Sequence, residues 1–203
     1  ERYPLLKPIV KLFPDGDKKL GIDQLNNAGN NSFYTRTEAQ YFLMRIHSGE
    51  NDLNKAKYLS KYLFETFPDN SIFHRYYTQI LYRSSNFSMC EKESQQIIDH
   101  YINKKKGYYE NDVRLAHFFL GEIFLSKRNI DQAIIHLKTS LKYAEKFKNQ
   151  KLGYTIYSNF LLGKIYYERN EFFNSKLYFK NVIKLTKRKD DLNQKSKEYI
   201  KKI

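Results

Sequence analysis

The sequence predicts an all-α fold in which antiparallel helix pairs stack into a solenoid, and three observations support this prediction. A helix-pair motif recurs four times and fades into a partial fifth copy. Apolar residues within the copies recur at spacings of three and four, as they do on one face of an α-helix. The chain of 203 residues contains only 8 Gly and 4 Pro, which suits helices joined by short turns.

In its clearest copies, the motif places a large apolar residue before a glycine on the first helix and a small residue on the second. Those copies read Leu120-Gly121-x-x-Phe124 with Ile130-x-x-Ala133-x-x-x-Leu137, and Leu162-Gly163-x-x-Tyr166 with Phe172-x-x-Ser175-x-x-x-Phe179. The upstream copies read Leu43-Met44-x-x-His47 with Leu53-x-x-Ala56, and Tyr77-Thr78-x-x-Leu81 with Phe87-x-x-Cys90. The small residues of the second helices are therefore 34, 43 and 42 positions apart.

These copies divide the chain into repeats joined by short turns. The repeats are predicted at 1–36, 37–70, 71–112, 113–152 and 153–190, followed by a polar terminal helix over 191–203 that caps the stack. In that helix, Leu192, Tyr199 and Ile203 are predicted to face the last repeat. In the first two repeats, helices are predicted at Leu5–Leu12, from an Asp17 cap to Ala28, at Glu38–His47 after a Thr37 cap, and at Leu53–Phe67. In the third repeat, one helix runs from a Ser71 cap to Leu81 and the other covers the segment with Cys90 and Ile102. In the last two repeats, the helices are predicted at Val113–Leu125, Ile130–Phe147, Ile156–Tyr167 and Phe172–Leu185. Residues 108–112 are predicted as an extra link that accounts for the spacing of 43.

The pattern resembles the tetratricopeptide repeat family, whose 34-residue unit is a pair of antiparallel helices. The resemblance covers residues 37–190 well and 1–36 weakly. It implies one continuous domain over 1–203, a right-handed α/α superhelix that holds other molecules rather than carrying out chemistry.

In that family the first helix of each unit lines the inner, concave surface, and this implies a set of partner-binding residues. Carried over by position, they are Tyr41, Arg45, Arg75, Gln79, Tyr82, Arg83, Phe118, Glu122, Phe160, Lys164 and Tyr167. Tyr and Arg are enriched at binding hot spots, so the set predicts a groove for an extended peptide or a partner helix, including an acidic one. The alternative is that these residues contact neighbouring helices.

The sequence departs from the family at the fourth position of each unit, where a large aromatic residue is usual. Gln40, His74, His117 and Asn159 stand there instead, which predicts irregular packing. The Lys and Asn pattern of the family's carboxylate-clamp subgroup is not reproduced either. Binding of a chaperone tail is therefore not expected.

The positive charge of the chain is concentrated in its C-terminal part. The net charge is +14; residues 1–112 carry 16 Lys and Arg against 14 Asp and Glu, whereas residues 113–203 carry 20 against 8. A basic half predicts an alternative function, which is binding of nucleic acid or an anionic surface. Solvated lysines on helix faces are the simpler explanation.

Motifs for catalysis or metal binding are not found. No two of the five histidines stand at metal-ligand spacing, and there is no phosphate-binding glycine loop or nucleophile elbow. Cys90 is the one cysteine, which excludes an internal disulfide, and its packing position predicts a structural role. We therefore expect a non-enzymatic interaction or scaffold protein without a cofactor.

The sequence says less about location. No apolar run approaches the length of a membrane span. A first residue of Glu1 fits removal of a signal peptide or of an upstream segment. The Tyr-, Lys- and Asn-rich composition resembles that of bacterial exported repeat proteins, which favours a periplasmic or exported location over a cytoplasmic one.

Overall fold

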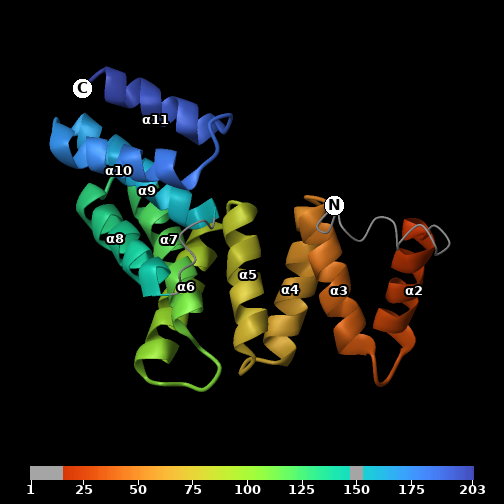
Figure 1. Cartoon of the computed structure of the whole chain (residues 1–203). Coiled ribbons are helices and arrows are strands. Elements are labelled where there is room, and N and C mark those ends of the chain that lie inside the picture. Colours follow the sequence, from red (N-terminus) through yellow and green to blue (C-terminus); the bar gives the residue numbers. More distant parts are fainter. Residues whose placement is uncertain (1–15, 147–152) are drawn as a thin grey trace. The chain divides into compact units, whose positions relative to one another are not determined.

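The structure, a computed structural model, describes residues 16–146 and 153–203, and within these ranges it consists of ten α-helices (Figure 1). They form two compact units, an N-terminal unit of Glu1–Phe67 and a C-terminal unit of Pro68–Ile203, and within each unit consecutive helices pack together. The predicted all-α, solenoid-like fold is confirmed. One continuous domain over 1–203 stays a prediction, and the predicted helix Leu5–Leu12 lies outside the described residues. None of the described helices is both long and apolar enough to cross a membrane.

In the N-terminal unit, α3 packs against both α2 and α4. The described helices of this unit are α2 (Lys18–Asn31), α3 (Arg36–Gly49) and α4 (Leu53–Thr66). Asp17 caps α2 as predicted, since its Oδ1 accepts from the Leu20 N–H at 2.9 Å. The prediction of Thr37 as the cap of α3 is wrong, because Thr35 is the N-cap. Ser32 Oγ accepts from the Thr35 N–H at 3.1 Å, and this tight turn lets α3 begin earlier than the sequence predicted.

The C-terminal unit contains three helix pairs and a terminal helix. They are α5 (Ser71–Arg83), α6 (Phe87–Ile102), α7 (Glu110–Ser126), α8 (Ile130–Lys146), α9 (Gly153–Glu168), α10 (Phe172–Leu185) and α11 (Asp191–Lys201). Each helix packs on the next, and α11 packs on α10 (Figure 1). The cap of α5 is Asn70 rather than the predicted Ser71, because Asn70 Oδ1 accepts from the N–H groups of Ile72 and Phe73.

The segment predicted as a link, residues 108–112, is mostly core and helix, which corrects the prediction. Tyr108 is only 5% exposed, and its hydroxyl forms a 3.0 Å hydrogen bond with His74 Nδ1. The first turn of α7 already includes Asp112, whose Oδ2 accepts from the Tyr109 N–H at 3.0 Å. An acidic residue in a first turn stabilises the helix start, and this begins α7 three residues before the predicted Val113.

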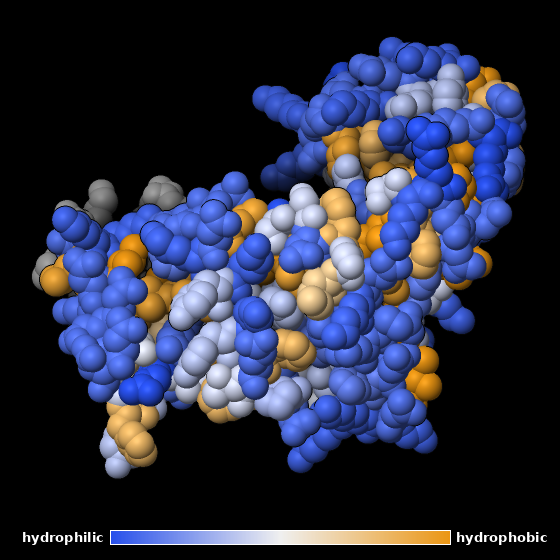
Figure 2. Space-filling view, turned by 180° about the vertical axis from the view of Figure 1, so that it is seen from behind, coloured by the Kyte–Doolittle hydropathy of each residue, from blue (hydrophilic) through white to orange (hydrophobic). Residues whose placement is uncertain are grey.

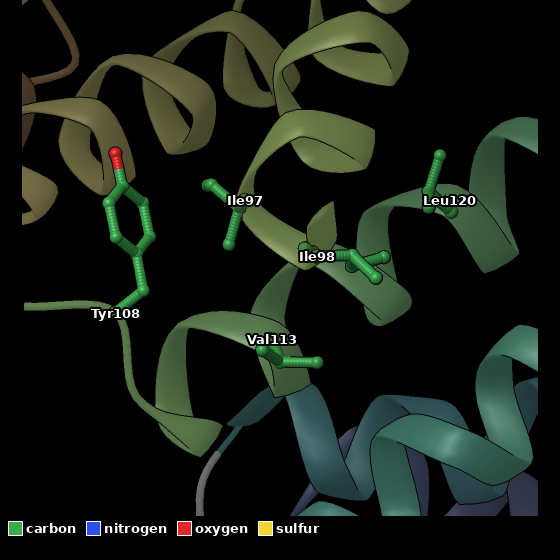
Figure 3. Packing of buried hydrophobic residues seen from close by; sticks show 6 residues of the cluster. Ile97, Ile98, Tyr108, Val113 and Leu120 are labelled. Atoms are coloured by element: carbon green, nitrogen blue, oxygen red, sulfur yellow. The ribbon is translucent and has the colours of Figure 1, made fainter. Parts of the chain in front are cut away.

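The core between α6 and α7 shows how that segment is held. Ile97 and Ile98 of α6 pack against Val113 and Leu120 of α7, and Tyr108 lies beside Ile97 (Figure 3). All five side chains are buried. Tyr108 therefore ties the connection to both helices through its ring.

The small residues that set the sequence register are fully buried where second helices meet first helices. Ala56, Cys90, Ala133 and Ser175 are all 0% exposed. Ser175 Oγ donates to the carbonyl oxygen of Gly163 at 2.9 Å. Cys90 holds the same position in the third repeat. Its Sγ lies 3.6 Å from the carbonyl oxygen of Thr78, the residue that corresponds to Gly163. The predicted structural role of Cys90 agrees with this burial.

The glycines of the motif allow the two helices of a pair to approach closely. A Cβ atom on Gly121 would lie 2.7 Å from Leu137, and one on Gly163 would lie 2.7 Å from Phe179. Real Cβ atoms do not come so close, so any side chain at these positions would push the helices apart.

Candidate functional site

Three first helices of the C-terminal unit, α5, α7 and α9, lie next to one another and carry most of the predicted partner-binding residues. We call their shared surface the first-helix face. It comprises Arg75, Gln79 and Tyr82 of α5, Asp112, Phe118 and Glu122 of α7, and Tyr154 and Tyr157 of α9.

Side-chain hydrogen bonds join the three helices across this face. Arg75 Nη1 donates to Asp112 Oδ1 at 2.7 Å, and the Tyr82 hydroxyl donates to Glu122 Oε2. Further along α5, Gln79 Nε2 donates to the Tyr154 hydroxyl at 3.3 Å. Side chains that are already fixed lose less conformational entropy when a ligand binds. The polar groups of the face are therefore preorganised.

An aromatic cluster lies beneath these polar pairs. The Tyr82 ring stacks on Phe119 with centroids 4.6 Å apart, and the Tyr154 ring is 4.7 Å from that of Phe118. Tyr157, which is 37% exposed, has its ring 6.2 Å from Phe118. Phe118 itself is 0% exposed. It forms the floor of the cluster, and the tyrosines form its accessible rim.

The two carboxylates of the face differ in their surroundings. Asp112 is 2% exposed but accepts hydrogen bonds from Arg75 and from the Tyr109 N–H. Glu122 has no cation beside it among the described residues, and burial raises its pKa to about 7. Near neutral pH, Glu122 is therefore populated both as an acid and as a carboxylate.

Two predicted binding residues of α9, Phe160 and Tyr167, pack against the terminal helix α11. Tyr199 of α11 lies 6.3 Å from the Phe160 ring and 5.1 Å from the Tyr167 ring. Phe160 is buried and belongs to the cluster that α11 closes. Both rings hold the terminal helix in place. Lys164, between them in sequence, is half-buried.

The terminal helix therefore packs much as predicted, with one exception. Leu192 and Tyr199 face the last helix pair. Ile203 was expected to do the same but is 37% exposed, and Ile200 packs in its place. Helix α11 ends at Lys201, so Ile203 follows the last helical residue instead of lying on the packed face.

Three predicted binding residues remain, two in the N-terminal unit and one in the C-terminal unit. In the N-terminal unit, the Arg45 guanidinium lies over the Tyr41 ring at 5.6 Å, a cation–π contact at the surface. In the C-terminal unit, Arg83 is half-buried at the end of α5.

The polar residues at the fourth motif position connect helices. Gln40 of α3 donates to the carbonyl oxygen of Gly29 in α2 at 3.1 Å, and Asn181 of α10 donates to Asn159 of α9 at 3.1 Å. His74 Nε2 of α5 is 3.0 Å from Glu93 Oε2 of α6. At these positions polar contacts between helices, two of them hydrogen bonds, stand where the tetratricopeptide pattern has a large aromatic residue.

His117 and His136 also meet, although their spacing in the sequence gave no sign of it. Their Nδ1 atoms are 2.8 Å apart, as in a hydrogen bond between two neutral imidazoles. Burial, together with His136, lowers the pKa of His117 to about 4. In the described part of the chain, no group of three or more His, Cys, Asp or Glu side chains could hold a metal ion. We assign the pair to the packing of α7 on α8.

Sequence reasoning missed three residues of the first-helix face, Asp112, Tyr154 and Tyr157. Asp112 was placed in a link, and Tyr154 lay before the predicted start of its helix. The signal for Asp112 was an acidic residue three positions after Tyr109, which resembles a capping box without the usual Ser or Thr. Tyr157 carried no signal beyond its helical position.

Comparison with known proteins supports the fold and no more. No protein-family model matches the chain, and no curated protein does. Among solved structures, the chain is similar to the crystal structure of BtubC (BKLC) from P. vanneervenii, with a TM-score of 0.63 and 13% sequence identity. The match covers 93% of this chain and 87% of that one. A likeness at this identity shows a shared all-helical fold.

Proposed function

We propose that this chain is a non-enzymatic, tetratricopeptide-like repeat protein that binds another protein on its first-helix face. The observation that carries the proposal is the set of hydrogen bonds between α5, α7 and α9, which fixes polar groups above an aromatic cluster. Rigid aromatic side chains combined with directional polar groups are typical of binding hot spots. The buried small residues of each helix pair, together with the two glycine contacts, support the family assignment.

The charges of the face indicate the chemistry of the partner. Arg75 is already neutralised by Asp112, and Glu122 adds a group that is partly negative at neutral pH. An acidic partner, which the sequence had suggested, is therefore not favoured here. We infer a peptide or helix with apolar side chains for the tyrosine rings and a hydrogen-bond donor for Glu122.

Hydrophilic residues cover most of the face of the molecule seen in Figure 2, and apolar residues emerge there in small groups. Large apolar patches usually mark obligate interfaces. A mixed polar and aromatic site fits a partner that binds and dissociates.

The test uses substitutions that leave the buried charges in place. Gln79→Ala combined with Tyr157→Ala removes an amide and an accessible ring from the face. The matched control is Gln132→Ala with Phe173→Ala, which removes the same two types of group from exposed positions on α8 and α10. We expect a protein captured from source lysate by the wild type to be retained by the control and lost by the face variant. Equal capture by both folded variants would refute the assignment of this face.

Binding of nucleic acid by residues 113–203 is the second candidate, and the excess of basic residues there favours it. Its affinity should fall steeply with salt, because each neutralised phosphate releases a counterion. A titration of labelled duplex DNA and single-stranded RNA at several salt concentrations tests this. Absence of binding at low salt would exclude it.

A further inference from the structure

A cavity of about 460 Å³ opens among α8, α9 and α10, and cations dominate its charged lining. Lys138 and Lys142 of α8 and Lys184 of α10 line it, whereas Glu145 is its one acidic lining residue. None of the three lysines forms an ion pair with a described residue. All three lysines are exposed, so an anion from solvent can reach them and is attracted by their combined charge. We call this site the lysine cavity.

One of these lysines is held in place by aromatic rings. The Lys138 ammonium lies over the Tyr166 ring at 5.3 Å, and Tyr166 stacks on Tyr178 with centroids 5.6 Å apart and an interplanar angle of 2°. Tyr178 also lines the cavity. This contact favours one position of an ammonium group that is otherwise exposed.

A buried arginine adds to the positive charge behind the cavity wall. Arg114 is 3% exposed and donates to Asn111 Oδ1 at 3.2 and 3.1 Å and to Thr155 Oγ1 at 3.4 Å. Both acceptors are neutral, and no described carboxylate pairs with the guanidinium. Burial of a charge is costly unless an opposite charge compensates it. Burial also lowers the pKa of Arg114, as expected for a cation without an anion beside it.

Thr155 connects this guanidinium to the cavity that it lines. A hydroxyl that accepts from a guanidinium can still donate its own proton to a second acceptor. Asn181 is a further lining donor, already oriented by its hydrogen bond to Asn159 Oδ1 at 3.1 Å. The site therefore offers hydrogen-bond donors and positive charge to an anionic ligand.

We propose that the lysine cavity binds a small phosphate-bearing molecule, whose phosphate oxygens contact Lys138, Lys142 and Lys184. Phosphate carries more charge than a carboxylate and has more acceptor oxygens, so it satisfies several converging cations at once. The volume falls within the range of roughly 300–1,000 Å³ typical of small-molecule sites. This site uses different residues from the first-helix face and does not depend on the function proposed for that face.

The test is calorimetric titration of the full chain with inorganic phosphate, pyrophosphate and ADP at about 0.15 M salt, where surface charges are largely screened. The test variant is Lys138→Ala/Lys142→Ala/Lys184→Ala. The matched control, Lys92→Ala/Lys106→Ala/Lys201→Ala, removes the same charge from exposed positions of the C-terminal unit. Pyrophosphate should bind the wild type and the control alike, and it should bind the test variant at least about tenfold more weakly, as loss of one charge-assisted contact predicts.

Two further comparisons sharpen the result. Thr155→Ser keeps the hydroxyl and should retain pyrophosphate binding, whereas Thr155→Val keeps the shape and should weaken it. Tighter binding of ADP than of pyrophosphate would identify an organic phosphate as the ligand class, and the reverse would identify an inorganic one. No binding at millimolar pyrophosphate would overturn the proposal, as would equal losses in the test and control variants.

Discussion

The first-helix face and the lysine cavity share helix α9, but they differ in whether their charged side chains have partners. On the face, Arg75 is bonded to Asp112 and Tyr82 to Glu122. At the cavity, three lysines line the wall and the buried Arg114 lies behind it, and none of these side chains forms an ion pair with a described carboxylate. Residue type alone therefore does not identify a binding site. The paired charges of the face contribute to the stability of the fold, whereas the exposed lysines of the cavity are available to an anionic ligand.

The largest expected effect comes from breaking a pair on the face. Arg75→Ala should reduce the free energy of unfolding by about 2–3 kcal/mol, because it leaves the Asp112 carboxylate buried without its cation. The double variant Arg75→Ala/Asp112→Asn should recover part of the loss. Urea denaturation measures both. A loss for Arg75→Ala no greater than that for a surface lysine would show that the pair contributes little.

A smaller effect is expected from the glycine that brings α9 onto α10. Gly163→Ala places a Cβ atom 2.7 Å from the Phe179 ring, which is closer than the two groups can pack. The variant should therefore lower the free energy of unfolding by roughly 1–2 kcal/mol, although Ala has the better helix propensity. It should also weaken pyrophosphate binding, since α10 forms one side of the lysine cavity.

Gly21→Ala in α2 is the control for this change, because an added Cβ atom there meets nothing within 4 Å. That variant should gain up to about 1 kcal/mol in thermal or urea denaturation. If both alanine variants changed the free energy of unfolding in the same direction, the close contact at Gly163 would not contribute measurably to stability.

Glu122 gives a pH-dependent difference. Its folded pKa of about 7 lies above the usual value, so the folded state favours the protonated form. The stability associated with this group is complete below the unfolded pKa and is lost as the pH rises to about 7. Glu122→Gln should therefore leave stability nearly unchanged at pH 4 and raise it clearly at pH 8, where the wild-type carboxylate is buried in its charged form. Denaturation curves at both pH values test this, and a pH-independent difference would contradict the account.

The smallest effect on stability is expected in the lysine cavity. Replacing Lys138, Lys142 and Lys184 with Ala should change the melting temperature little, because all three side chains are exposed and the Lys138 contact with the Tyr166 ring is a weak one at the surface. Differential scanning fluorimetry without ligand measures this. A marked loss of stability would show that the lysines are structural and that the comparison drawn above is mistaken.

The sequence predicted the helix pairs well because their spacing depends on buried small residues. Ala133 and Ser175 fix where second helices meet first helices, and the predicted bounds of α10 agree with the structure. The errors lie at helix starts. Thr37 and Ser71 are good capping residues, but Thr35 and Asn70 precede them and take the caps instead. Competition between adjacent capping residues depends on the incoming chain direction, which local sequence does not specify.

The candidate site was less predictable than the fold, because side-chain pairing depends on tertiary contacts. Position in the repeat correctly placed Tyr82 and Glu122 on first helices. It gave no sign that the two would bond to each other, or that Phe118 would be fully buried. The meeting of His117 with His136 likewise follows from the packing of α7 on α8.

The most direct test of the central claim is site-specific photo-crosslinking in source cells. A photoreactive amino acid replaces either Tyr157 on the first-helix face or Phe173 on α10, which is 85% exposed. We expect position 157 to crosslink to one protein, the same one that is lost by the Gln79→Ala/Tyr157→Ala variant, and position 173 not to crosslink to it. Crosslinking of that protein only at position 173, or equally at both, would contradict the assignment of the first-helix face as the binding surface.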